Sequence, residues 1–277
     1  MREIGIFKAL LIYFGPQLLV IIGALIFFGE DINLNIMSLI GSLITIFIIF
    51  KCGKINKSLI TRNIENFKKK FNFKEIIIVV LTQILISISL SMIISSVEYI
   101  NNPTKAIEMM SEEVIIYNNF LELRLVGVII TTLIPIMEEL IFRRIIFSKI
   151  AKKRGILIGA IISSSIFGIL HIDLDVLGAI IFGVTCCILY LKYDNILIPI
   201  SVHMINNGIA VIMEMVAFFS SEDSVVDYTM TNNDIKFNLI FGGILLIVSL
   251  TMFGVFLVKN KNYLTNKNNN NLESLEF

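Results

Sequence analysis

The sequence predicts an all-α, polytopic membrane protein with about eight transmembrane helices. Of its 277 residues, 56% are hydrophobic and only 16% are charged, and the mean hydropathy is +0.86, which is far from the balance of a water-soluble domain. Apolar runs of 16 to 24 residues recur along the chain between short polar connections. The net charge of +1, with no basic face, argues against nucleic-acid binding.

Eight apolar segments can be placed from this pattern. They span residues 9–28, 34–50, 75–97, 125–148, 155–171, 176–191, 196–219 and 237–258. The fifth and sixth are short, about 25 Å each at 1.5 Å per residue, so we expect their shared turn at 172–175 to lie within the protein, below the outer surface. We expect a single transmembrane domain over 1–258 and a disordered, Asn-rich cytoplasmic tail over 259–277.

The distribution of lysine and arginine predicts the orientation in the membrane. When alternate connections are grouped, 20 of the 23 Lys and Arg residues fall on one side and three on the other. Because cytoplasmic loops retain basic residues, we expect both termini in the cytoplasm. The Ile-, Asn- and Lys-rich composition suggests a prokaryotic plasma membrane. The basic connection at 51–74 could lie on the anionic inner leaflet or form a solvated loop.

One apolar segment contains charges that a bilayer disfavours. Pro135 to Arg144 reads P-I-M-E-E-L-I-F-R-R within the run at 125–148. A charge at the bilayer centre costs about 2.5 to 3.5 kcal/mol on insertion scales, so such residues are candidates for function. At helical spacing Glu139 and Arg143 share a face and can form a supporting ion pair, whereas Glu138 points about 100° away and is the candidate general base. A purely structural ion network is the alternative.

Both histidines also lie in apolar segments. His171 ends the fifth segment, and His203 precedes Asn207 by four residues, which places an imidazole and a carboxamide on one helix face. Two such donors could hold a developing oxyanion, and Asn206 is the rival for the amide position. Counted from the cytoplasmic helix ends, Glu138 and His203 reach similar depths, whereas His171 lies deeper. Each histidine alone is also compatible with a helix-packing hydrogen bond.

Three short motifs therefore follow one another on successive apolar segments. They are E-E-x-x-x-R from Glu138, F-x-x-x-H from Phe167 and H-x-x-x-N from His203. Together they resemble the motif set of the CPBP family of intramembrane endopeptidases, also called the Abi or type II CAAX prenyl endopeptidase family. The resemblance covers residues 126–208, inside an expected motif core of 125–219.

The resemblance implies an eight-helix hydrolase that cleaves peptide bonds in membrane-associated substrates. By matching position, Glu138 would be the catalytic carboxylate, and His171 would help it to activate water. His203 and Asn207 would polarise the scissile carbonyl or hold the oxyanion, with Glu139 and Arg143 in support. The partner would be a membrane peptide or protein in the lipid bilayer. Eukaryotic family members trim prenylated C-termini, and bacterial ones resemble enzymes or immunity factors linked to peptide bacteriocins.

The residues leave the cofactor and the class of function open. No cofactor is favoured, but Glu138, His171 and His203 could form a zinc-binding set, in which case Glu139 would have to serve as the base and Asn207 would have no evident role. A non-catalytic bacteriocin-immunity protein would keep the fold and bind a peptide partner. A proton-coupled transporter would also use buried Glu, His and Arg, although the sequence has no pair of similar halves.

Overall fold

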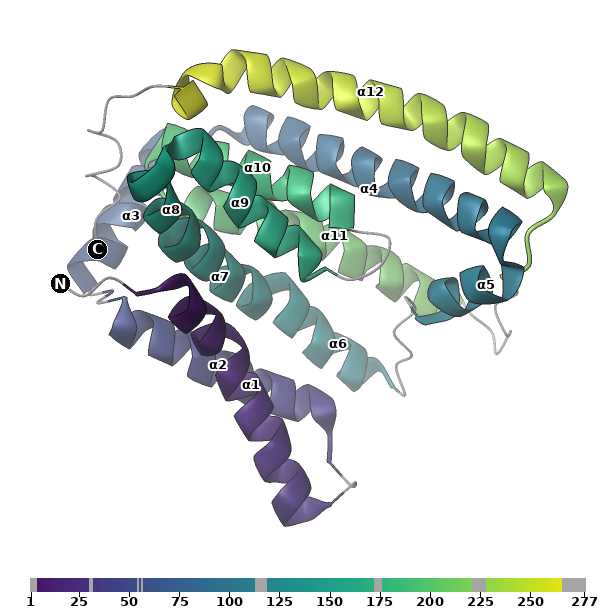
Figure 1. The fold of residues 1–277 in the computed structure, drawn as a ribbon. Coiled ribbons are helices and arrows are strands. Elements are labelled where there is room, and N and C mark those ends of the chain that lie inside the picture. The colour runs from purple at the N-terminus through teal and green to yellow at the C-terminus, as the bar shows by residue number, and fades with distance from the viewer. Residues whose placement is uncertain are drawn as a thin grey trace.

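The computed structural model describes residues 4–29, 32–53, 55, 57–112, 119–171, 176–220 and 228–265. Within these ranges all regular structure is helical, as the sequence predicted (Figure 1). The helices, with η marking a π-helix, are α1 (Ile6–Phe28), α2 (Leu34–Cys52), α3 (Lys57–Lys70), α4 (Phe73–Asn101), α5 (Pro103–Glu112), α6 (Phe120–Val128), η1 (Ile129–Leu133), α7 (Ile134–Glu138), η2 (Glu139–Phe147), α8 (Ser148–Arg154), α9 (Ile156–Ile169), α10 (Val176–Tyr193), α11 (Leu197–Ser220) and α12 (Asn232–Thr265).

All eight predicted apolar segments are helical. Seven helices of the described chain are long and apolar enough to cross a membrane, and one of them runs from Phe120 to Arg154 through α6, η1, α7, η2 and α8. The remaining segment, the fifth, is α9, whose 14 residues rise only about 21 Å, so this part of the predicted short pair is indeed short. The chain is an integral membrane protein.

Figure 1 shows three groups of helices. α1 and α2 pair as a hairpin at one edge, and α4 and α12 run side by side at the opposite edge. Between these pairs lie the helix from Phe120 to Arg154 and helices α9, α10 and α11. The most apolar stretch of α10 is 61% buried, whereas that of α1 is only 17% buried, so α10 is central and α1 presents its apolar side chains outwards, as a lipid-facing helix does.

Large apolar side chains from η2, α9 and α10 fill the centre of the bundle. Those that are almost fully buried include Phe142, Ile146, Phe147, Phe167 and Ile188. α9 and α10 approach closely where Gly183 faces Ser164, because a Cβ at Gly183 would lie 2.8 Å from the Ser164 Cβ. This close contact fixes α9, and with it the second motif, against α10.

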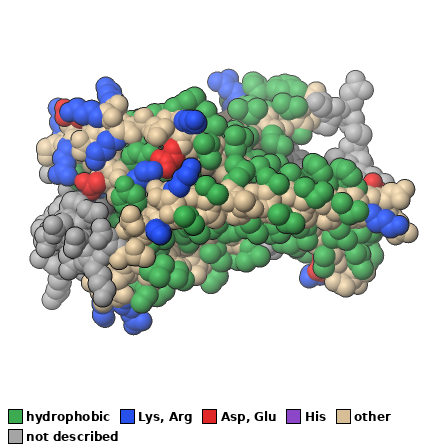
Figure 2. Space-filling view, turned by 90° about the horizontal axis from the view of Figure 1, so that it is seen from above, with side chains coloured by type: hydrophobic (Ala, Val, Ile, Leu, Met, Phe, Trp, Pro, Cys, Tyr) green, Lys and Arg blue, Asp and Glu red, His purple; other side chains and the backbone are tan. Residues whose placement is uncertain are grey.

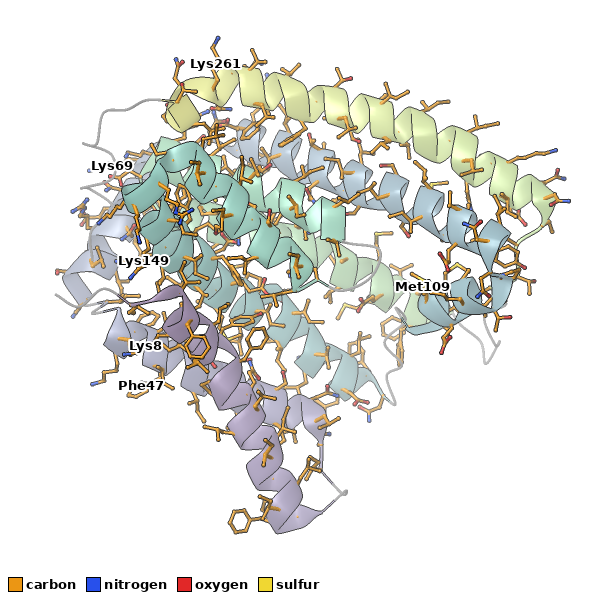
Figure 3. All side chains as sticks on the ribbon, in the orientation of Figure 1. Lys8, Phe47, Lys69, Met109, Lys149 and Lys261 are labelled. Carbon is orange, nitrogen blue, oxygen red and sulfur yellow. The ribbon has the colours of Figure 1, made fainter. Side chains whose placement is uncertain are left out.

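Basic side chains gather at the end of the molecule where α1 begins and α12 ends. The last turns of α3 and α8 each carry three cations. Figure 2 shows most of the Lys and Arg side chains of the visible face near this end. In Figure 3, Lys8, Lys69, Lys149 and Lys261 all lie towards it, whereas Met109 lies at the other end. The asymmetry counted in the sequence is therefore an asymmetry in space.

The basic connection between α2 and α4 contains the amphipathic helix α3. Its backbone accepts a hydrogen bond at Asn63 O from Asn195 Nδ2, at 2.8 Å. Lys70 Nζ, at its end, donates to Tyr193 O at 3.0 Å. α3 also packs against α11. The connection is thus a docked helix rather than a solvated loop.

Helix α12 corrects the predicted start of the C-terminal tail. It continues to Thr265, seven residues into the range that was expected to be disordered. Tyr263 and Leu264 pack against the central core, and Asn260 Nδ2 donates to Phe256 O at 2.9 Å. This apolar packing holds the helix beyond residue 258, whereas residues 266–277 lie outside the described ranges.

Candidate active site

The helix that carries the first motif contains two π-helical stretches. η1 precedes α7 and η2 follows it, so Glu138 is the last residue of α7 and Glu139 the first residue of η2. π-helical turns are rare and often occur at functional sites. The sequence pattern, interpreted as a regular α-helix, did not predict them. Both glutamates therefore sit where the helix changes its hydrogen-bond register.

The end of η1 is completed by a side chain from another helix. The Ile134 N–H donates to Ile129 O, five residues back, as π-helical geometry requires. The next such bond would join residue 135 to Ile130 O, but Pro135 has no N–H. Asn207 Nδ2 donates to Ile130 O instead, at 3.1 Å. The asparagine of the third motif thus ties α11 to the helix of the first motif.

Hydroxyl groups donate to two carbonyls of η2. Ser163 Oγ on α9 donates to Phe142 O at 2.8 Å, and Ser148 Oγ donates to Arg143 O at 3.2 Å. A backbone carbonyl without a partner is costly in apolar surroundings. These donors therefore stabilise the wide turns, and the Ser163 bond also joins α9 to η2.

Glu138 is buried, and its two oxygens have different surroundings. The Tyr13 hydroxyl of α1 donates to Oε1 at 2.7 Å. Oε2 lies 3.7 Å from His203 Nε2, beyond hydrogen-bond distance, and has no hydrogen-bond partner in the described part of the chain. One oxygen is therefore held by the protein, and the other is left to interact with a substrate or water.

Glu139 forms the ion pair with Arg143 that the sequence predicted. Glu139 Oε2 lies 3.1 Å from Arg143 Nε, without the angle of a hydrogen bond, and both side chains are at most 1% exposed. Glu139 Oε1 also lies 2.9 Å from His203 Nδ1. Because an ionised carboxylate can only accept, Nδ1 donates, and His203 Nε2 is turned towards Glu138. The two adjacent glutamates of one segment thus meet His203 of another.

Phe167 of the second motif connects the remaining members of the site. Its ring centroid lies 4.3 Å from the Arg143 guanidinium carbon. The same ring lies 4.4 Å from the His171 ring centroid and 6.1 Å from that of His203. The two histidines, which the sequence placed at different depths, therefore flank one buried side chain. Phe182 adds a second edge-on contact to His203, at 4.9 Å.

His171 is held by a bond to its own helix. Its Nδ1 lies 2.9 Å from Phe167 O, and since a carbonyl only accepts, Nδ1 must donate. Nε2 is then the nitrogen that can accept a proton. Among the described contacts, His171 makes no hydrogen bond to Glu138. The turn at 172–175, predicted to lie below the outer surface, is outside the described residues.

Asn207 uses one amide hydrogen for the Ile130 carbonyl and retains another. Asn206, its rival in the sequence interpretation, donates from Nδ2 to Asn207 Oδ1 at 3.5 Å. The two amides are therefore linked. In the described structure it is Asn207 that contacts the helix of the first motif.

The zinc-ligand set considered from the sequence is not assembled in the described ranges. Within them, no three His, Cys, Asp or Glu side chains are arranged to hold a metal ion. Glu138 Oε2 and His203 Nε2 face each other, whereas the recorded polar contact of His171 is with a carbonyl. These donors do not fit a three-ligand site, so no step below is routed through a metal.

An apolar cavity of about 550 Å³ lies between α3, α11 and the helix of the first motif. Its lining residues include Phe67, Ile136, Leu140, Arg144, Ile200 and Met204. Leu140 directly follows Glu139, and Met204 directly follows His203. The cavity is thus lined by the sequence neighbours of Glu139 and His203, whereas the side chains of the polar cluster themselves do not line it.

Tyr13 is the site residue that the sequence interpretation missed. It lies in the first apolar segment, which contributed nothing to the three motifs. The only signal available was a hydroxyl within a mainly apolar run that also contains Gln17. Its contact with Glu138 joins residues that are 125 positions apart.

The comparison with protein families points to the region that carries the three motifs. Residues 120–209 match the family described as Type II CAAX prenyl endopeptidase Rce1-like. Over 113 residues the chain is 36% identical to a Bacillus subtilis (strain 168) protein named "Putative membrane peptidase YdiL". That match covers 40% of this chain and 43% of the relative, so the chain spans less than half of the relative's length. No solved structure matches the chain.

Proposed function

We propose that this chain, whose residues 120–209 belong to the CPBP family, is an endopeptidase that hydrolyses a peptide bond in a membrane-associated peptide or protein. One observation carries the proposal. Glu138, Glu139 and His203 come from two segments far apart in the sequence and meet in a buried cluster inside the matched range. Buried carboxylates next to an imidazole are suited to general acid and base catalysis.

Glu138 is the proposed base. Water lies against Oε2, which takes a proton while the water oxygen attacks the carbonyl carbon of the substrate. His171 Nε2 assists as a second acceptor at the water. When the C–N bond breaks, the proton passes from Glu138 to the leaving nitrogen, so that the products are a carboxylic acid and an amine. Because Tyr13 occupies Oε1, Oε2 is the oxygen available for this transfer.

His203 and Asn207 are the proposed oxyanion donors. Asn207 retains one N–H after its bond to Ile130 O. His203 Nδ1 already donates to Glu139, so donation from Nε2 requires the doubly protonated ring. Two carboxylates, the Arg143 guanidinium and an imidazolium would then balance in charge. Donors of this kind act most strongly in a site that excludes water.

The apolar cavity supports a substrate with an apolar portion. It is lined by the same two helices that carry Glu138 and His203, so a substrate bound at the cluster could extend an apolar group into it. A lipidated chain end or an apolar bacteriocin-related peptide would meet this requirement. Filling the cavity by Ile200→Trp should raise the KM for such a substrate more than it lowers kcat.

The reaction is proposed to need no metal. The alternative is a zinc site at Glu138, His171 and His203, with zinc supplying an activated water. Elemental analysis of the purified protein, with cleavage measured before and after dialysis against a chelator, separates the two. Stoichiometric zinc whose removal abolishes cleavage, and whose return restores it, would refute the metal-free reaction.

The test of the proposed function is Glu138→Gln. General acid and base catalysis contributes about 10²- to 10⁴-fold, so we expect a loss of at least about 100-fold. Membrane peptides from cells with the wild-type protein are compared by mass spectrometry with those from cells with the variant. A peptide cut only in the former is synthesised and added to purified protein in lipid vesicles. Glu214→Gln, which changes a glutamate of α11 outside the cluster, is the matched control and should retain activity.

Two results would contradict the proposal. Equal cleavage by the wild-type protein and Glu138→Gln would remove Glu138 from the reaction. If no peptide differs, but Glu138→Ala still protects cells against a bacteriocin, the chain is a non-catalytic immunity protein.

We also propose that the basic end of the molecule faces the cytoplasm of a prokaryotic cell, with both chain termini on that side. The gathering of Lys and Arg at this end supports the orientation (Figure 3). A phosphatase that is active only outside the cytoplasm, fused after residue 277, should be inactive. The same enzyme inserted between α4 and α6 should be active, and the reverse pattern would contradict the orientation.

A further inference from the structure

Tyr13 contacts the proposed base from outside the segment that defines the family match. Its hydroxyl donates to Glu138 Oε1 at 2.7 Å, whereas the match begins only at residue 120. Tyr13 lies on α1, a helix that is otherwise mostly exposed. A polar contact from such a helix to a buried carboxylate needs an explanation beyond lipid-facing packing.

The ring of Tyr13 is held on both sides. It lies edge-on to Phe142, with centroids 5.8 Å apart, and edge-on to Phe14 at 4.8 Å. One turn earlier, Ala9 is fully buried, and Ile12 is only 7% exposed. The small side chain of Ala9 lets α1 approach the bundle, and the aromatic contacts then aim the Tyr13 hydroxyl at Glu138.

The contact determines how the Glu138 carboxylate is oriented. With Oε1 bound to Tyr13, rotation of the carboxylate would break a hydrogen bond to an ionised group, which is worth more than one between neutral groups. Oε2 is thereby kept on the side of His203 Nε2, 3.7 Å away, and no hydrogen bond within the described chain competes for it.

We propose that Tyr13 is a positioning residue, which fixes the rotation of the Glu138 carboxylate and reserves Oε2 for the proton of the attacking water. This inference rests on the proposed function. It assigns to the N-terminal helix α1 a part in the reaction, although α1 carries none of the three motifs. The hydroxyl does the positioning, and the ring contributes only packing.

The hydroxyl and the ring can be separated by substitution. Tyr13→Phe keeps the contacts with Phe142 and Phe14 but removes the donor, whereas Tyr13→Leu removes both. Tyr193→Phe is the matched control, because the Tyr193 hydroxyl also donates to a glutamate, Glu75, at a place outside the cluster. The wild-type protein and these three variants are studied as full chains in lipid vesicles. The substrate is the synthetic peptide that is cut in cells with the wild-type protein but not in cells with Glu138→Gln.

We expect Tyr13→Phe to lower kcat by about 10- to 100-fold, the range for losing one hydrogen bond to a charged group, with KM within about twofold of the wild-type value. Because the buried Glu138 carboxylate loses a hydrogen bond in the folded state, Tyr13→Phe should unfold at a somewhat lower detergent concentration than the wild-type protein, while it stays folded in the vesicles used for the assay. Tyr193→Phe should retain the wild-type kcat. Tyr13→Leu should lose kcat to a similar extent as Tyr13→Phe, since both lack the hydroxyl.

Three outcomes would overturn the inference. Tyr13→Phe could cleave at the wild-type rate, it could change KM alone, or it could restore the activity that Tyr13→Leu loses, which would mean a packing role. In each case cleavage by the wild-type protein and its loss in Glu138→Gln would leave the proposed function intact. If the wild-type protein cuts no peptide that Glu138→Gln spares, the proposed function fails first, and the inference fails with it.

Discussion

Replacing Glu139 by Gln removes one charge of the buried pair with Arg143 and preserves most of the geometry. A glutamine has the same shape and offers an oxygen that can still accept from His203 Nδ1. The variant would leave Arg143, which is 1% exposed, as a buried cation without its nearest counter-charge. The change in stability then reports the electrostatic contribution of this pair.

The structure allows the magnitude to be worked out. Unit charges 3.1 Å apart attract by about 5 kcal/mol at an effective dielectric constant of about 20. Removal of one partner from a buried pair costs about 3 to 5 kcal/mol. Because the contact of Arg143 with the Phe167 ring persists in the variant, we expect Glu139→Gln to lower the free energy of unfolding by about 3 to 4 kcal/mol.

The assay is reversible unfolding in mixed detergent micelles, followed by circular dichroism, for the wild-type protein and four variants. Arg143→Met leaves the opposite charge buried and should be similarly unstable. The double variant Glu139→Gln with Arg143→Met removes both charges and should recover much of the loss. Glu98→Gln is the control, because the Glu98 pair with Lys105 has a similar distance, 2.8 Å, but is partly exposed. This substitution should cost no more than about 1 kcal/mol.

Two results would refute this reasoning. Glu139→Gln could unfold within about 1 kcal/mol of the wild-type protein, which would mean that Arg143 finds other compensation. The double variant could also be no more stable than the sum of the single changes predicts. That result would show that the two side chains do not interact as a pair.

Two further predictions use the same unfolding assay. Gly183→Ala should cost about 1 to 3 kcal/mol, because its Cβ would lie 2.8 Å from Ser164 on α9, whereas Gly254→Ala, with nothing within 4 Å, should be neutral or slightly stabilising. A Gly183→Ala protein as stable as the wild type would show that α9 and α10 can separate freely. Ser163→Ala should cost about 1 to 3 kcal/mol, since Phe142 O loses its donor in η2. No loss would mean that this carbonyl finds another partner.

Contacts that follow from spacing along one helix were predictable from the sequence. Glu139 and Arg143 are four residues apart, and this spacing still brings them together in η2. The residue count from the cytoplasmic helix ends likewise predicted that Glu138 and His203 could meet, because it placed them at similar depths, and Glu138 Oε2 lies 3.7 Å from His203 Nε2. The short fifth segment was also predictable, since segment length depends only on where apolar residues stop.

Contacts between segments that carry no pattern were not predictable. No rule of composition or periodicity pairs Tyr13 with a residue 125 positions away. The π-helical stretches depend on donors from other helices, such as Asn207 for Ile130 O. The sequence indicated Asn207 as an oxyanion donor but gave no sign of this backbone bond. Pro135 was a local hint, because a proline inside a helix leaves a carbonyl of the preceding turn without its usual N–H donor.

The wide turns of η1 and η2 also bear on how this helix can change length during evolution. An α-helix turns by about 100° per residue. Deletion of one residue within α7 would therefore rotate Glu138 by about 100° relative to the preceding helix, and so away from Tyr13. A deletion within η1 could instead be absorbed, because the wide turn would close to an ordinary one and the later residues would keep their direction. The π-helical stretch η1 is thus a place where this membrane helix can lose a residue while its glutamates still face inwards.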